Sequence, residues 1–258
     1  MQTTEAVERV CALTAEHADR ARIDRARQRQ GDVLAGNEPD YLPLMLPGAI
    51  PELDDLPDYD WAEQFNDPAC SFVMQMKATT RAAAGHDMVP SLRADTGVIN
   101  APTVFGATYD VPAHTKPVIN RPMPKEALQE FDEPDDIAGL GVLPTMVEHT
   151  EHHLQVLADH GLDGIVDVHH CDTQGPYDIA HQARGSDIFM DIVEDPDFFH
   201  DLMRKSLDIY IKLSRLSKGL ANEGNWGNAS GVWMHKGGVR MCEDTSILMS
   251  RPMYDENV

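Results

Sequence analysis

The sequence predicts a β/α barrel, of which this chain represents roughly the N-terminal half. Short apolar runs typical of strands, such as residues 165–168, alternate with longer stretches of helical periodicity, such as residues 143–160. Polar side chains follow three of these runs directly, at residue 95, at residues 170–172 and at residues 243–244. In β/α barrels the reactive side chains lie at the carboxyl ends of the strands. The alternation and the polar strand ends therefore predict a parallel sheet with helices outside it.

Composition places the chain among globular proteins. It has 258 residues, of which 42% are hydrophobic, enough to bury a large core in one β/α domain or two small ones. Its formal net charge of −22 argues against binding to nucleic acid or to an anionic membrane surface. There is no apolar run of membrane-spanning length, and the N-terminus is charged rather than signal-like. These features, with four scattered cysteines that indicate reduced thiols, predict a soluble cytoplasmic enzyme.

The N-terminal segment is expected to be a single helix over residues 4–30. Its polar face is rich in arginine and its apolar positions are few, so residues 1–36 are interpreted as a helical arm across a domain or a partner subunit. The arginine face is expected to be solvated, with an anionic ligand as the alternative. The barrel domain then covers residues 37–258.

Four apolar runs are expected to form the strands of this domain. They lie at residues 41–47, 88–93, 165–168 and 239–242. Residues 105–111 indicate a loop or small hairpin. The four prolines of residues 112–124 exclude a helix or a central strand. Residues 222–238, rich in glycine and tryptophan, indicate a mobile loop at the barrel rim.

Helices are expected between these strands. One occupies the second half of residues 61–81 and is capped by Gly85, and another covers residues 143–160. Two short helical pieces follow at residues 179–185 and 188–193. Pro196, after an Asp195 cap, begins a helix that runs to about residue 218, and Ser250 caps a last one. Four βα units leave two unpaired sheet edges, which predicts either a fragment of a longer barrel or a half-barrel completed by dimerisation.

Three blocks of sequence resemble the uroporphyrinogen decarboxylase superfamily. They are VPSLRADTG at residues 89–97 with FGA at 105–107, DTQGPYDIA at residues 172–180, and EDTSILMS at residues 243–250. Their order and spacing carry the resemblance. It implies a (β/α)8 barrel from residue 40 onward, incomplete at the C-terminus. The superfamily includes the decarboxylase of haem synthesis and zinc-dependent methyltransferases that serve corrinoid proteins.

The resemblance implies catalytic and substrate-binding residues. Asp95 falls where the decarboxylase has an essential aspartate that stabilises a cationic intermediate, although it could instead cap the loop through Gly97. Asp244 falls where the decarboxylase has a substrate-contacting serine, and Gln182 lies near the position of its tyrosine. Asp95 and Asp244 are therefore the candidate catalytic residues. The candidate substrate-binding residues are Arg93, Asp172, Gly175, Pro176 and Gln182.

Two of these positions have a second interpretation, and one family motif is missing. Gly175 and Pro176 are expected to approach a ligand through the backbone, to form a sharp turn between strand and helix, or to do both. Relatives that decarboxylate carry an Arg-Gln-Ala-Gly-Arg-Tyr segment in the first strand, where residues 46–51 read LPGAIP here. A polycarboxylate substrate needs cationic partners, so the absence of arginine argues against decarboxylation.

The methyltransferase alternative requires zinc and a corrinoid protein partner, whereas the decarboxylase needs no cofactor. His170, Cys171 and Cys242 follow strands and form a candidate zinc site, although adjacent residues of a strand point to opposite faces. His149, His152 and His153 lie on one side of a helix, where a solvated face is expected and a metal site is the alternative. Three functions therefore stay open: a lyase acting on a tetrapyrrole, a methyltransferase acting on a small methylated molecule, and a non-catalytic interaction module.

Overall fold

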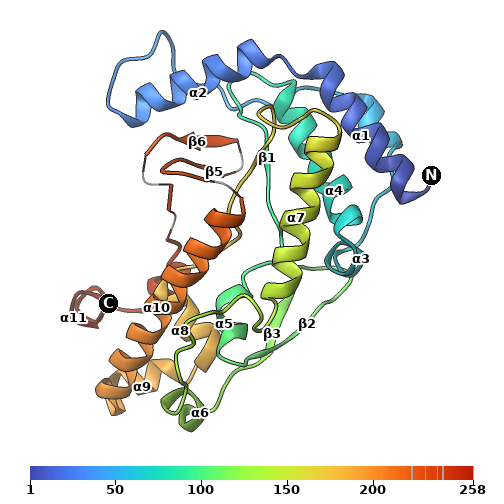
Figure 1. Cartoon of the computed structure of the whole chain (residues 1–258). Coiled ribbons are helices and arrows are strands. Elements are labelled where there is room, and N and C mark those ends of the chain that lie inside the picture. The colour runs from blue at the N-terminus through green and yellow to red at the C-terminus, as the bar shows by residue number, and fades with distance from the viewer. Residues whose placement is uncertain (222, 230, 237, 240, 258) are drawn as a thin grey trace. The chain divides into compact units, whose positions relative to one another are not determined.

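The computed structural model describes residues 1–221, 223–229, 231–236, 238–239 and 241–257, and it is a mixed α/β structure made mostly of helices (Figure 1). The chain divides into two compact units. Unit 1 comprises residues 1–95, 148–170 and 218–239, and unit 2 comprises residues 96–147, 171–217 and 240–258. Within the described residues, there is no helix that combines the length and the apolar character needed to span a bilayer.

The single N-terminal helix expected over residues 4–30 is wrong, because two helices form there. Helix α1 covers Thr3–His17 and helix α2 covers Arg20–Leu34. The chain is extended at Ala18, and the Asp19 side chain accepts a hydrogen bond from the backbone N–H of Arg22, so Asp19 is the N-cap of a new helix. Helix α1 packs along α4, Pro68–Ala83, and contributes buried residues to the core of unit 1. It is a core helix rather than an arm.

The arginine face of α2 is only partly solvated, because Arg20 and Arg25 are exposed whereas Arg22 and Arg27 are bonded to protein. Arg22 donates to the carbonyl oxygens of Ala83 and Met88, at 2.7 and 3.0 Å. Arg27 forms an ion pair of 2.9 Å with Asp167. The bond to Ala83 satisfies a carbonyl at the end of α4 that has no partner within the helix. The arginines therefore hold α2 against unit 1.

The next helices follow the expected pattern, with one change at a cap. After a 3-10 turn η1 at Pro51–Asp55, helix α3 covers Trp61–Asn66 and begins with a capping box of Asp60 and Glu63. Asp67 caps α4, whose first residue is Pro68. The helix ends at Ala84, which takes the C-cap position expected for Gly85.

Two of the four expected strands form, and they pair in parallel as predicted. Strand β1 covers Ser91–Leu92 and pairs with β4, Asp167–Val168, in the register Ser91 to Asp167. The strand expected at residues 41–47 is wrong: Leu44 and Asp87 bond to each other through one backbone bond and one bond to the Asp87 carboxylate instead of a ladder. The strand expected at 239–242 includes Arg240, outside the described residues, and residues 239, 241 and 242 are not in a strand. A complete barrel is thus not directly shown in the described part of the chain.

A hairpin replaces part of the mobile loop expected at residues 222–238. Strands β5, Gly227–Ala229, and β6, Val232–Met234, pair antiparallel. The hairpin lies beside α2 (Figure 1), where the backbone N–H of Trp233 donates to the Gln30 side chain at 2.5 Å. Residues 222, 230 and 237 of the expected loop lie outside the described residues.

Unit 2 contains the other hairpin and most of the remaining helices. Strands β2, Thr108–Asp110, and β3, Val118–Arg121, pair antiparallel, so the hairpin extends beyond the loop or small hairpin expected at residues 105–111 into the proline-rich segment 112–124. The helices are α5 Asn100–Val104, α6 Lys125–Gln129, α8 Pro176–Arg184, α9 Ile188–Glu194 and α10 Pro196–Leu220, and α10 ends in unit 1. A 3-10 turn η2, Asp244–Leu248, precedes α11, Arg251–Asn257. Ser250 begins α11 as expected, since its carbonyl accepts from the Tyr254 N–H at 3.0 Å.

The histidines of α7, Leu143–Asp159, lie inside unit 1 rather than on a solvated face. His149 and His153 are buried, and the rings of His152 and His153 pack against Phe72 of α4. The ring centroids of His149 and His153 are 6.1 Å apart. Burial lowers the pKa of all three histidines, most strongly that of His153. His149 and His153 are therefore neutral components of the core, and His152 lies half-buried beside them.

We predict that acid destabilises the protein through this histidine cluster. The unfolded chain binds protons near the ordinary histidine pKa and the folded chain binds them only at lower pH, so stability is full above that pKa and falls as pH drops below it. The thermal midpoint should therefore fall by several degrees between pH 7 and pH 5, and His153→Leu should flatten this dependence. Scanning calorimetry checks this, with exposed His114→Asn as the control that should keep the wild-type slope.

Candidate functional site

The carboxyl ends of β1 and β4 bring predicted site residues to one edge of the parallel pair in unit 1. Arg93 and Asp95 follow β1, and His169 and His170 follow β4. A guanidinium nitrogen of Arg93 lies 3.7 Å from an Asp95 carboxylate oxygen, and both side chains are largely buried. The backbone N–H of Arg93 donates to the Gln75 side chain of α4 at 3.1 Å, which fixes the backbone where it leaves β1. Asp95 thus faces a cation of its own chain.

His170 is oriented by a buried carboxylate. Its Nδ1 lies 2.8 Å from Oε2 of Glu223, whose side chain is fully buried. The ammonium of Lys218 lies 2.9 Å from the same oxygen and also donates to the carbonyls of Trp226 and Gly238. Because a carboxylate only accepts hydrogen bonds, Nδ1 of His170 carries the proton, and Nε2 is the nitrogen left for other chemistry.

Sequence reasoning identified His170 but missed Glu223 and Lys218. Glu223 lies 53 residues beyond His170, in a stretch read as a mobile loop. The local pattern around Glu223 contains no signal for this pairing. A general expectation that a histidine at a strand end needs an orienting carboxylate would have prompted a search for one.

In unit 2 a pair of carboxylates joins the start of α8 to the start of η2. The Glu243 carboxylate accepts from the backbone N–H groups of Tyr177 and Asp178, at 3.3 and 3.2 Å. The Asp178 carboxylate accepts in return from those of Asp244 and Thr245, at 2.8 and 2.9 Å. We call this reciprocal arrangement the carboxylate clasp. It satisfies four N–H groups that have no partner within their own helical turns.

The clasp changes the ionisation of groups around it. Burial raises the pKa of Glu243, and the negative charge of Asp178 acts in the same direction, while the two amide bonds oppose them. Burial also raises the pKa of Tyr177 to about 12. The Tyr177 ring is fully buried and its hydroxyl is therefore neutral at ordinary pH.

Gly175 and Pro176 form the turn that brings the start of α8 against the clasp. The backbone N–H of Gly175 donates to the Cys242 carbonyl at 2.6 Å, and a Cβ atom at Gly175 would overlap the Glu243 carboxylate and that same carbonyl. Pro176 is the first residue of α8, where its missing N–H costs nothing. Before them, Gln174 adopts a left-handed backbone with φ 51° and donates to the Asp172 carboxylate at 2.7 Å. The structure thus shows a tight turn packed on residues 242 and 243.

A groove of about 540 Å³ opens beside the clasp in unit 2. Helix α8 contributes Asp178, His181 and Gln182, and η2 contributes Asp244 and Thr245. Its apolar lining is Val98, Val118, Ile119 and Pro122. The groove therefore contains two predicted site residues, Gln182 and Asp244, together with Asp178 and His181, which sequence reasoning missed. Burial lowers the pKa of His181, so this side of the groove carries a neutral imidazole.

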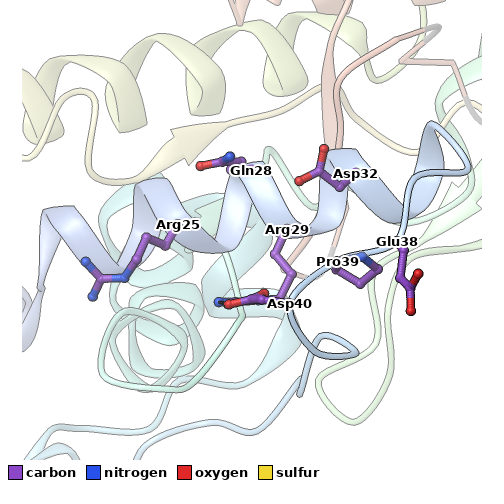
Figure 2. Close-up of a pocket in the computed structure, with 7 residues that line it drawn as sticks. All are labelled: Arg25, Gln28, Arg29, Asp32, Glu38, Pro39 and Asp40. Atoms are coloured by element: carbon purple, nitrogen blue, oxygen red, sulfur yellow. Dashed lines mark hydrogen bonds and ion pairs between the residues drawn. The ribbon is translucent and has the colours of Figure 1, made fainter.

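A second hollow, of about 300 Å³, lies beside α2 in unit 1 (Figure 2). Figure 2 shows Arg29 directed at Asp40, to which it donates two hydrogen bonds of 2.7 and 3.0 Å. Arg29 is also paired with buried Asp87 and lies 3.7 Å from the Tyr41 ring centre. Its charge is therefore compensated within the protein, and this hollow has the character of a structural ion-pair network.

The candidate zinc ligands are His170, Cys171 and Cys242. In the part of the chain that the structure describes, there is no group of three or more His, Cys, Asp or Glu suited to hold a metal ion. Cys171 is buried and its backbone N–H donates to Ser217 at 2.8 Å, and Cys242 is half-buried. The zinc site at His170, Cys171 and Cys242 stays a prediction.

Comparison with known proteins gives one informative likeness. No protein-family model matches the chain, and no curated protein is similar to it in sequence. A methyltransferase from Methanosarcina mazei has a similar structure, with a TM-score of 0.53 and 16% sequence identity. The similarity covers 77% of this chain and 56% of that protein, so the chain spans just over half of its length. At this identity the likeness shows a shared fold.

We predict that Gly175→Ala destabilises unit 2. The added Cβ has no space beside Glu243, and relieving the overlap would open the clasp, at a cost of about 1–3 kcal/mol. Chemical denaturation of the variant measures this loss. Gly139→Ala is the matched control, because a Cβ there meets nothing within 4 Å, and its stability should stay within about 1 kcal/mol of wild type.

We also predict that Lys218→Met costs more stability than Lys218→Met combined with Glu223→Gln. The single variant leaves the Glu223 carboxylate buried without its ammonium partner, which costs about 3 kcal/mol, whereas the neutral amide of the double variant needs none. Urea unfolding of wild type, both single variants and the double variant measures the coupling. Additive losses would contradict a direct interaction, and exposed Lys236→Met is the control for loss of charge alone.

Proposed function

We propose that this chain belongs to a methyltransferase of the uroporphyrinogen decarboxylase-like superfamily. The observation that carries the proposal is the structural similarity to a methyltransferase over 77% of the chain. The proposed substrate is a small methylated molecule, and the proposed partner is a corrinoid protein. The similarity supports this reading better than the decarboxylase reading.

The environment of Asp95 also favours methyl transfer over decarboxylation. A decarboxylase would use this carboxylate to stabilise a cationic pyrrole intermediate. Here a guanidinium nitrogen of Arg93 lies 3.7 Å away, and that positive charge competes with a cationic intermediate for the same carboxylate. Residues 46–51 contain no arginine for a polycarboxylate substrate.

In the proposed reaction the described residues bind substrate and handle a proton. The sulfur of a thiol would form a bond to the methyl carbon as the bond between that carbon and its donor breaks, with the bonding electron pair left on the donor. Nε2 of His170 takes up the thiol proton, and Glu223 balances the charge of the resulting imidazolium. Within unit 2, considered by itself, the groove with Gln182 and Asp244 is the proposed surface for a small ligand. Bound zinc would activate a thiol as thiolate, but the described residues do not provide three ligands, so no step is assigned to it. Cytoplasmic location and a homodimer that completes the barrel stay predictions.

The test is a direct comparison of the two reactions on the full chain. Methylcobalamin with a small thiol measures methyl transfer by the loss of methyl-cobalt absorbance, and uroporphyrinogen measures decarboxylation by chromatography of its products. We expect thiol-dependent demethylation above the protein-free rate, a loss of about tenfold or more in His170→Gln, and little change in Asp95→Asn. The exposed His114→Asn variant should keep the full rate.

Each contrary result points to a different conclusion. Decarboxylation that Asp95→Asn abolishes would replace the proposal with the lyase reading. Demethylation lost on adding a chelator and restored by zinc would add the metal to the proposal. Absence of both reactions would overturn the enzyme reading for this chain and favour an interaction module.

A further inference from the structure

We propose that the groove beside the carboxylate clasp binds an organic ammonium ion that carries an apolar group. The inference deepens the proposed function and rests on it in one respect, since such an ion would then be the methylated substrate. Binding itself requires no reaction and can be measured alone.

The charge of the groove is negative. Its lining residues include Asp178 and Asp244 and contain neither lysine nor arginine. His181, which also lines it, is kept neutral by burial. Arg184, two residues beyond Gln182 on α8, is held by Asp187 and Asp191 at 3.0 and 2.7 Å. An anionic ligand would thus meet carboxylates with no cation among the lining residues, whereas a cation would be attracted.

Two acceptors that line the groove have no partner within the described part of the chain. Both oxygens of Asp178 are used by the clasp, which fixes η2 and with it the position of Asp244. The Asp244 side chain is exposed, and its carboxylate forms no hydrogen bond or ion pair within the described residues. The Oε1 atom of Gln182 is shielded from bulk water and has no hydrogen-bond partner there either. Leaving a buried acceptor unpaired is unfavourable, so a ligand that donates hydrogen bonds is favoured.

Part of the lining is apolar, which favours a ligand with an apolar substituent. Val118 and Ile119 of β3, with Val98 and Pro122, face the groove. Val98 and Val118 are among the exposed large hydrophobic side chains, so this wall is accessible to a ligand. The volume of about 540 Å³ suits a small organic molecule rather than a bare ion. A groove that combines unpaired acceptors with an apolar lining matches a cationic amine that carries an apolar substituent.

Three probes of nearly equal size separate charge from apolar contact. Benzylammonium, benzyl alcohol and benzoate are titrated against the full chain by nuclear magnetic resonance at low salt. We expect benzylammonium to bind more tightly than the alcohol, and benzoate not to bind. The preference should weaken as salt is added, because Asp244 is exposed.

Variants then assign the binding to this groove. Asp244→Asn should weaken the binding of benzylammonium about threefold, which is the range expected for an exposed ion pair. The same variant should leave the binding of benzyl alcohol unchanged. Gln182→Met removes the unpaired acceptor and should by itself weaken the binding of benzylammonium. Asp135→Asn removes an exposed carboxylate of unit 2 outside the groove and should change nothing. Thermal unfolding of each variant verifies that unit 2 is intact.

Several outcomes would overturn the inference. Equal binding of the three probes, binding that Asp244→Asn and Gln182→Met both leave unchanged, or no benzylammonium binding would each do so. Specific binding without methyl transfer would keep the groove and overturn only the proposed function. Methyl transfer with no ammonium binding would keep the proposed function and overturn the groove.

Discussion

The carboxylate clasp is the interaction on which the groove of unit 2 depends. It joins Tyr177 and Asp178 to residues 66 positions further along the chain, through charge-assisted bonds at both ends. Such bonds contribute about 1.5–3 kcal/mol each when the carboxylates are ionised. They act together, because Glu243 reaches the start of α8 only where Gly175 leaves space. The loop 171–175, the first turn of α8 and η2 therefore form one structural unit.

Charge pairing is the corresponding constraint in unit 1. The chain is strongly acidic, yet the carboxylates that unit 1 buries are matched to cations: Asp87 to Arg29, Asp167 to Arg27 and Glu223 to Lys218. Burying an unpaired carboxylate costs several kcal/mol, so these pairs determine which acidic residues can lie inside. The pairing with Lys218 lets Glu223 stay buried while it orients His170. The same buried carboxylate is therefore paired for stability and orients His170 at the carboxyl end of β4.

The local features of the sequence predicted several elements well. Residues 143–160 and 196–218 have helical periodicity with clear stop and start signals, and α7 and α10 form there. The single N-terminal helix was wrong because the chain is extended at Ala18 and Asp19 caps a second helix, a signal that the arginine pattern obscured. Residues 41–47 have the apolar character of a strand but meet the Asp87 carboxylate instead of a neighbouring strand. Strand formation depends on a partner, which a local pattern does not contain.

What the sequence by itself determined was the alternation of elements, the parallel pairing of β1 with β4, and the clustering of polar residues after them. These follow from hydrophobic periodicity and from caps, which act over a few residues. Only the tertiary structure decided which polar residues interact: His170 with Glu223, 53 residues away, and Asp178 with the residues of η2. It also decided that His149 and His153 are buried. The physical reason is that burial and ion pairing depend on chain segments brought together by packing, whose identity no local spacing encodes.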